Sequence, residues 1–184
     1  MKNTSLTYGE VTSKGILQLI NYMENNNLIN AQTVFVDIGC GYGTLTKMIQ
    51  HLVDIEVIGI EIDPKKAEIA TEITKWTLNK NKIKILSGSF EDYPHIFNKA
   101  TVIFSNCISF DQILTEKLLK MVGKNTTFIH NSAKINEIIS PIDILPLYCT
   151  WSCSPIKYYR INDVSSIPTL KTFKTWIKTQ FNKE

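Results

Sequence analysis

The sequence contains no apolar run that approaches the ~18 residues of a membrane-spanning helix. Its first ten residues, MKNTSLTYGE, lack the apolar centre of a secretory signal peptide. No internal repeat and no low-complexity segment interrupts the chain. The cysteines form no C-x-x-C pair, so neither a redox dithiol nor a zinc site is expected among Cys40, Cys107, Cys149 and Cys153. These absences disfavour membrane, secreted and zinc-binding classes, and predict a cytoplasmic or nuclear protein without a metal.

A chain of 184 residues with 43 % hydrophobic and 20 % charged residues has the composition of one globular domain. We expect a single domain, residues 1–184, in three parts. The parts are an N-terminal loop and helix at 1–30, an α/β core at 33–161 and a basic C-terminal helix at 168–184.

The decapeptide VFVDIGCGYG, Val34 to Gly43, is the most informative stretch. A β-branched run that ends in an acid and closely spaced glycines predicts a buried strand that turns sharply into a helix beside a ligand. A dinucleotide site reads G-x-G-x-x-G, whereas here the third glycine comes one residue early. The pattern favours a nucleoside that bears an amino acid, and resembles motif I of the class I S-adenosylmethionine-dependent methyltransferases. The residues expected at this cofactor are Asp37, Gly39, Gly41 and Gly43.

Alternating strand and helix patterns predict an α/β fold with a mostly parallel central sheet and helices on both faces. The methyltransferase resemblance implies the Rossmann-like version of this architecture. We expect an antiparallel hairpin at the end of the sheet, with both strands inside 147–161 and a loop at 140–146. The predicted helices cover 10–23, 45–52, 64–78 and 114–121, with Thr12 or Ser13 capping the first.

The second predicted strand ends at Glu61, 22 residues after Gly39. In folds of this kind a carboxylate at that position binds the two ribose hydroxyls, and we assign Glu61 this role. The alternative is a solvent-facing acid before a helix that begins at Pro64, with Asp63 as its N-cap.

Two further turns at the carboxyl ends of strands predict ligand contacts. After the third strand, Ser89 and Phe90 are expected near adenine, although Phe90 could equally be a core residue. The fourth strand breaks into polar residues at Asn106, which is therefore a candidate site residue. The Pro-Pro-aromatic sequence of base N-methyltransferases does not follow Asn106, which weakens that alternative.

Four stretches together resemble the Dot1-type protein-lysine methyltransferases, which lack a SET domain. They are TYGE at 7–10, VFVDIGCGYG, VIFSNCISF at 102–110 and TWSCSPIKYY at 150–159. The resemblance implies methyl transfer from S-adenosylmethionine to a lysine ε-amine of a protein such as nucleosomal histone H3. It implies cofactor contacts from Tyr8, Asp37, Gly39, Glu61 and Phe90. It places Asn106 between cofactor and lysine with Phe110 beside it, and Trp151 and Tyr158 along a lysine channel.

Departures from the family pattern qualify this prediction. Ser89 replaces an acid, which shifts adenine recognition toward Glu91 or Asp92. Only the catalytic core is similar, as in a compact archaeal or viral relative. Trp151 could instead be a core residue, and strand alternation lets only one of Tyr158 and Tyr159 face the site. The rival functions are methylation of an RNA base or a small molecule, and a nucleotide-binding interaction module without catalysis.

The last segment carries the whole formal charge of +3, because 168–184 holds four lysines and one glutamate while the acids and bases before it balance. An apolar helical stripe predicts docking on the body through Leu170, Phe173, Ile177 and Phe181. Beside it, Lys171, Lys174 and Lys178 form a candidate contact for nucleosomal DNA or another polyanion. The alternative is a solvated helix face.

Overall fold

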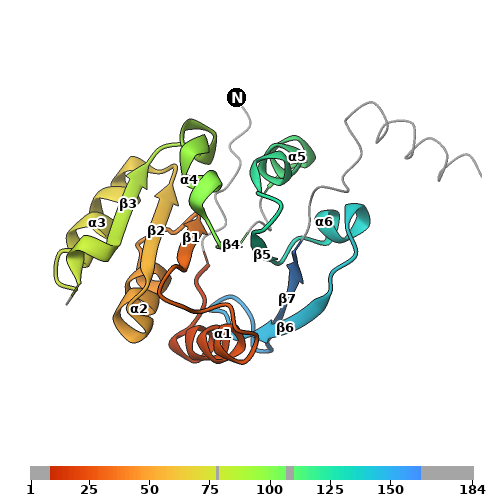
Figure 1. The fold of residues 1–184 in the computed structure, drawn as a ribbon, viewed down its shortest axis with the longest axis horizontal. Coiled ribbons are helices and arrows are strands. Elements are labelled where there is room, and N and C mark those ends of the chain that lie inside the picture. Colours follow the sequence, from red (N-terminus) through yellow and green to blue (C-terminus); the bar gives the residue numbers. More distant parts are fainter. Residues whose placement is uncertain (1–8, 78, 107–109, 163–184) are drawn as a thin grey trace, which may run out of the picture.

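The computed structural model describes residues 9–77, 79–106 and 110–162. Its centre is a seven-stranded sheet in the order β3-β2-β1-β4-β5-β7-β6 (Figure 1). The strands are β1 Val34–Ile38, β2 Glu56–Glu61, β3 Ile83–Ser87, β4 Val102–Ser105, β5 Thr127–His130, β6 Asp143–Leu147 and β7 Ile156–Ile161. β1 to β5 run parallel, whereas β7 is antiparallel to both β5 and β6. The predicted mostly parallel sheet with an antiparallel end is confirmed.

Helices cover both faces of the sheet (Figure 1). The described helices are α1 Ser13–Asn25, α2 Thr44–Val53, α3 Pro64–Thr74, α4 Pro94–Lys99, α5 Gln112–Met121 and α6 Ala133–Ile138, with short 3-10 turns η1 Lys80–Lys82 and η2 Phe90–Asp92. One buried cluster joins α1 and α2 to the sheet, and a second joins α4, α5 and α6 to its other face. Because the inner strands β1, β2 and β4 are buried on both faces, they read as nearly continuous apolar runs.

Local signals set where the first helices begin. The Thr12 side chain accepts a hydrogen bond from the Gly15 amide at 3.2 Å, which confirms it as the N-cap of α1. Asp63 caps α3 by accepting from the Lys65 amide at 2.9 Å, and Pro64 occupies the first turn. This cap fixes the chain direction directly after Glu61.

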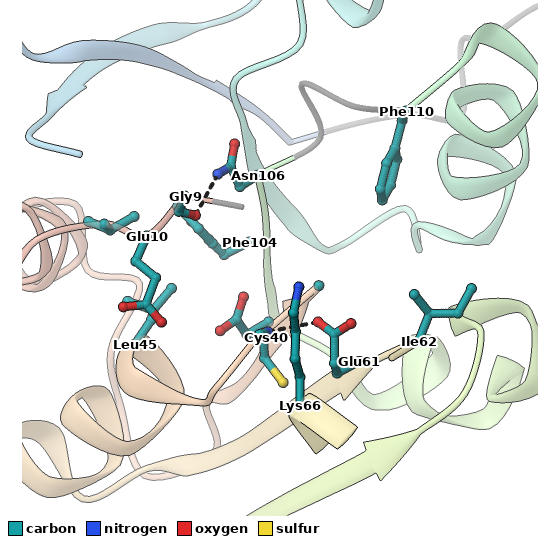
Figure 2. A pocket seen from close by; sticks show the side chains of 14 residues that line it. Gly9, Glu10, Cys40, Leu45, Glu61, Ile62, Lys66, Phe104, Asn106 and Phe110 are labelled. Carbon is teal, nitrogen blue, oxygen red and sulfur yellow. Dashed lines mark hydrogen bonds between the residues drawn. The ribbon is translucent and has the colours of Figure 1, made fainter. Parts of the chain in front are cut away.

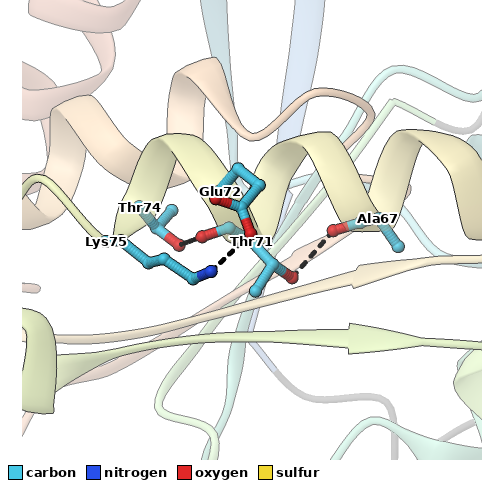
Figure 3. Close-up of polar contacts among 5 residues, drawn as sticks. All are labelled: Ala67, Thr71, Glu72, Thr74 and Lys75. Carbon is cyan, nitrogen blue, oxygen red and sulfur yellow. Dashed lines mark hydrogen bonds and ion pairs between the residues drawn. The ribbon is translucent and has the colours of Figure 1, made fainter.

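Helix α3 ends at Thr74, four residues before the predicted end (Figure 3). The hydroxyl of Thr71 donates to the Ala67 carbonyl at 2.8 Å, and that of Thr74 donates to the Thr71 carbonyl at 2.9 Å. Threonine hydroxyls that bond back to carbonyls compete with the helical ladder. The exposed Lys75–Glu72 ion pair does not extend the helix, since such surface pairs contribute little.

The terminal hairpin exists, but the predicted position of its first strand was wrong. The stretch expected as a loop forms β6, which pairs Leu145 with Tyr158 of β7. Leu145 and Leu147 are buried against α1, while Pro146 is exposed. Proline suggested a loop, but an edge strand tolerates it because one side of its backbone needs no partner.

The segment 148–155 between β6 and β7 turns back to the N-terminal loop instead of forming a strand. The Thr12 amide donates to the Tyr148 carbonyl at 2.9 Å, and Val11 forms an isolated bridge with Cys149. Within the described ranges, no helix is long and apolar enough to span a membrane. Tyr8 and the tail residues Lys171, Lys174 and Lys178 lie outside the described residues.

Candidate active site

A pocket opens at the carboxyl ends of β1, β2 and β4 (Figure 2). Three segments distant in sequence close it, namely the loop after β1, the end of β2 and the N-terminal residues Gly9 to Val11. Its lining is Gly9, Glu10, Val11, Asp37, Gly39, Cys40, Gly41, Leu45, Glu61, Ile62, Lys66, Phe104, Asn106 and Phe110. Six predicted site residues are in that set: Asp37, Gly39, Gly41, Glu61, Asn106 and Phe110.

The glycines after β1 are required by backbone geometry. Gly39, Gly41 and Gly43 all have positive φ, at 77°, 57° and 78°. Side chains rarely tolerate this region, and a Cβ on Gly43 would also lie 3.0 Å from the Cβ of Ala70. The loop therefore brings bare backbone to the pocket and starts α2 directly beside it.

Glu61 is held by two backbone amides. One carboxylate oxygen accepts from the Gly41 amide at 2.8 Å, and the other accepts from the Asp63 amide at 2.8 Å. The residue is only 7 % exposed. Each oxygen keeps a lone pair that can accept a hydroxyl hydrogen. This arrangement suits the ribose role predicted for Glu61, although the contact itself stays a prediction.

Asp37 is a buried acid in the same pocket. Its carboxylate accepts from the Thr46 hydroxyl at 2.9 Å. Burial raises the pKa of Asp37 to about 7, Thr46 opposes this shift, and the nearby Glu61 and Glu10 carboxylates add to it. A carboxyl poised near neutrality ionises readily when a cationic group binds beside it.

A smaller cavity adjoins the first and shares Gly39, Ile62 and Phe110 with it. Ser89 and Phe90 line this cavity. Phe90 is 5 % exposed and stacks on Phe110 with ring centroids 6.2 Å apart, so it is both a core residue and part of the cavity wall. Its mostly apolar lining, with the rings of Phe90 and Phe110, is of the kind that packs against a purine ring.

The acids proposed to replace the family's adenine-binding residue are engaged elsewhere. Asp92 accepts from the Ser89 amide at 3.0 Å in a capping box, and Glu91 forms an ion pair with Lys117 at 2.8 Å. The Ser89 side chain accepts from the Glu91 amide at 3.3 Å. Adenine recognition by any of the three remains a prediction.

Asn106 links β4 to two other parts of the site. Its amide nitrogen donates to the Gly9 carbonyl at 3.3 Å, the bond drawn in Figure 2. Its amide oxygen accepts from the side chain of Asn131, which follows β5. Asn131 was not predicted, although the rule that selected Asn106, a polar residue after a buried strand, applies to it equally. Lys66 and Ile62 were also missed, because no motif marks them.

Trp151 reaches the same place from the segment between β6 and β7. The Thr150 amide donates to the Glu10 carbonyl at 2.9 Å, and the Glu10 amide donates to the Thr150 hydroxyl at 3.0 Å. A Cβ on Gly9 would lie 2.1 Å from Cε3 of Trp151, so the indole packs directly on Gly9. The half-buried Trp151 thus lies behind the pocket rim and is not among the lining residues.

The prediction that Tyr158 lines an open channel is wrong for this structure. Tyr158 has no exposed surface and stacks on Phe104 with centroids 5.1 Å apart. Alternation along β7 turns it toward α1, into the core on that face of the sheet. Because Phe104 lines the pocket, Tyr158 supports the wall from behind. Tyr159 points to the opposite face, with its ring 5.9 Å from that of His130.

A family model described as "Histone methylation protein DOT1" matches residues 1–140. The chain belongs to this family. A ribosomal protein L11 methyltransferase from Alkaliphilus oremlandii is 26 % identical over 134 residues, which are 72 % of this chain and 42 % of that protein. The chain therefore spans less than half the length of this curated relative.

Solved structures similar to this DOT1-family chain show its fold. An RNA methyltransferase from Salinibacter ruber in complex with S-adenosylhomocysteine aligns with a TM-score of 0.63 at 18 % identity, covering 82 % of this chain and 94 % of that one. A geranyl diphosphate C-methyltransferase from Streptomyces coelicolor, also with S-adenosylhomocysteine, aligns with a TM-score of 0.55 at 14 % identity, covering 71 % and 61 %. The predicted Rossmann-like class I methyltransferase fold is confirmed.

The site of this DOT1-family chain can be compared with the needs of S-adenosylmethionine, the cofactor that the sequence predicts. Its pocket fits that cofactor, because the glycine loop leaves no Cβ in the way and Glu61 presents fixed acceptors. Asp37 and Glu10 supply anionic groups, and the adjoining apolar cavity suits a purine. The residues that would hold the cofactor are Asp37, Gly39, Gly41, Glu61, Ile62 and Phe110.

Proposed function

We propose that the protein transfers a methyl group to the ε-amine of a lysine in a protein substrate, with nucleosomal histone H3 as one candidate. The observation that supports this proposal is the convergence of three segments that methyltransferases do not generally share. Gly9 and Glu10, Asn106 and Trp151 meet at one edge of the cofactor pocket. These are the segments on which the resemblance to Dot1-type enzymes rests, and their meeting beside the pocket supports a lysine acceptor there.

The surroundings of Asn106 suit a lysine ε-amine, which must be neutral before it can accept a methyl group. Bound S-adenosylmethionine supplies an electrophilic methyl group on a sulfonium sulfur. Phe104 and Phe110 line the pocket beside Asn106, and burial against such rings disfavours an ammonium and lowers the lysine pKa. The oxygens of Gly9 and Asn106 each accept one hydrogen bond and keep a lone pair for the amine hydrogens. They would aim the nitrogen lone pair at the methyl carbon, and the proton shed by the methylated nitrogen would pass to water.

A protein acceptor is favoured over a nucleic acid base or a small molecule by two observations. Asn106 does not begin the Pro-Pro-aromatic sequence that cradles planar amino groups. The curated relative is named for a protein substrate, ribosomal protein L11. The RNA and small-molecule enzymes among the structural neighbours are similar in fold alone.

The test is incubation with S-adenosylmethionine carrying a radiolabelled methyl group, over separate substrates. The panel holds nucleosomes, free histones, ribosomal protein L11 and total RNA, with the Asn106→Ala variant as the background. We expect label in protein, and acid hydrolysis should release it as methylated lysine. Label confined to RNA, or to an amino acid other than lysine, would overturn the proposal.

A further inference from the structure

Asn131 is a buried amide that no motif of the sequence marks. It follows β5 and is 9 % exposed. Its side-chain nitrogen donates to the oxygen of Asn106. The turn that carries it is tied to β5 on its other side, where the Ser132 amide donates to Nδ1 of the fully buried His130 at 3.2 Å. The backbone on either side of Asn131 is thus fixed to β5.

The partners of Asn106 determine which way its amide points. The Gly9 carbonyl can only accept, so the Asn106 nitrogen must face Gly9. The Asn106 oxygen then faces Asn131, which must donate. The three groups form one directed chain from β5 through β4 to the N-terminal loop.

This chain ends on the rim of the cofactor pocket. Gly9, Glu10 and Val11 line the pocket, and the indole of Trp151 packs against Gly9. A reversed Asn106 amide would set two carbonyl oxygens against each other at Gly9. The loop would lose one of its ties to the sheet, and the Asn106 group that faces Asn131 would be an N–H donor instead of an acceptor oxygen.

We propose that Asn131 is a positioning residue that fixes the amide orientation of Asn106 and, through Gly9, the loop Gly9–Val11 between cofactor and acceptor. This inference about Asn131 depends on the proposed function only for the identity of the acceptor. A purely structural asparagine would matter for folding but not for the direction in which Asn106 presents its oxygen.

The decisive variant is Asn131→Asp, which keeps the shape and removes the donor. An ionised carboxylate would repel the Asn106 oxygen, so kcat should fall at least about tenfold at pH 8, more than the affinity for S-adenosylmethionine falls. The ratio of variant to wild-type kcat should rise as the pH is lowered from 8 to 6. A protonated carboxyl can donate to Asn106 again, and burial beside carbonyl oxygens raises its pKa.

Asn162→Asp is the matched control at the opposite end of β5. The Asn162 oxygen only accepts there, from the Thr127 hydroxyl at 3.1 Å and from Arg160 at 3.1 Å. The same substitution should therefore leave kcat and its pH profile unchanged. If Asn131→Asp does not fold, Asn131→Ser should retain more kcat than Asn131→Ala, because its hydroxyl can donate. A variant ratio that does not change with pH, or equal rates for the serine and alanine variants, would overturn the inference.

Hydrogen exchange separates this inference from the proposed function, because it needs no acceptor. The amides of Glu10 and Thr12 are bonded to Thr150 and Tyr148 and should exchange faster in Asn131→Asp than in wild type. Faster exchange without lysine labelling by the wild type would defeat the proposed function and leave this inference standing. Unchanged exchange in Asn131→Asp, together with normal lysine labelling by that variant, would overturn this inference and leave the proposed function standing.

Discussion

The carboxyl edge of the sheet has two halves that are built differently. In the cofactor half, Asp37, the glycine loop and Glu61 lie within 25 residues of sequence, and the two adjacent strands β1 and β2 bring them together. In the other half, called the acceptor half after the proposed function, Gly9, Asn106, Asn131 and Trp151 come from four segments spread over residues 9–151. The first half is held by backbone amides, and the second by side-chain amides and one ring contact.

This difference predicts how substitutions in each half affect binding and turnover. Backbone conformation fixes the cofactor half, so a substitution there removes one ligand contact and leaves the scaffold in place. Side chains fix the acceptor half, so one substitution disturbs several groups. Energies of connected groups are not additive. Substitutions should therefore reduce turnover in the acceptor half and cofactor affinity in the cofactor half.

The largest effect is expected from Asn106→Ala, which removes the link between β4, β5 and the N-terminal loop. We expect kcat to fall roughly 100-fold, because small misplacements of reacting groups cost about that much. The affinity for S-adenosylmethionine, measured by calorimetry, should change far less. Equal losses of affinity and rate would place Asn106 in the cofactor half and remove the distinction between the halves.

Glu61→Ala should weaken binding of S-adenosylmethionine by about 1 to 3 kcal/mol, since a buried charged acceptor is lost from the ribose hydroxyls. Calorimetry measures the change directly. Asp63→Ala is the control, because it removes the cap of α3 and should lower thermal stability without a comparable loss of affinity. Unchanged affinity in the Glu61 variant would refute the ribose assignment.

Asp37 gives the cofactor half a dependence on pH. Its pKa of about 7 in the folded protein lies above the ordinary 3.8, so the folded state binds more protons between these values. The contribution of Asp37 to the stability of the free protein should therefore fall as the pH rises from about 4 to 7, whereas buried His130, with its pKa lowered to about 3, contributes with the opposite sign. A cationic ligand favours the ionised form, so its affinity should rise with pH in that window, by at most about tenfold per unit.

Asp37→Asn should flatten the pH dependence of affinity and remove the Asp37 contribution to the pH dependence of stability, which calorimetry and thermal melts of both proteins at pH 6 and 8 can show. The carboxylates that face Asp37 are Glu10 and Glu61, and the hydroxyl is that of Thr46. A pH dependence of stability that remains in the variant would include the contribution of buried His130. A wild-type affinity that does not vary with pH would contradict the shifted pKa.

The smallest effect at a single salt concentration is expected for Lys171, Lys174 and Lys178, which lie outside the described residues and rest on sequence alone. If the tail contacts a polyanion such as nucleosomal DNA, replacing all three lysines by glutamine should reduce the slope of log affinity against log salt by about one per lysine. Affinity for S-adenosylmethionine should stay the same. An identical salt slope in the triple variant would leave the tail without this role.

Prediction from sequence succeeded where the determinant was local. The glycine loop was recognised because positive φ at Gly39 and Gly43 demands glycine. Asp63 was considered as the cap of a helix that begins at Pro64, one of two alternatives, and the structure confirms that cap. The edge strand β6 was missed, because Pro146 gives a turn signal that only its place at the sheet edge overrides.

The acceptor half could not be predicted to the same degree. The same sequence rule selects Asn106 and Asn131, but it does not say that the two residues form a pair. That pairing depends on β5 lying next to β4. The position of Tyr158 depends on the register of β7, which turns it toward Phe104 and leaves Tyr159 on the other face. A shift of one residue would exchange the two tyrosines.

The sequence by itself determined the fold class, the cofactor loop and the acid that ends β2, because short-range backbone geometry and the alternation of strands and helices encode them. Only the tertiary structure decided that the loop at Gly9, the amides of Asn106 and Asn131 and the ring of Trp151 meet at one point. It also decided that Tyr158 is buried behind Phe104. These arrangements depend on strand order and register, which arise from packing across the whole sheet and leave no pattern within any single segment.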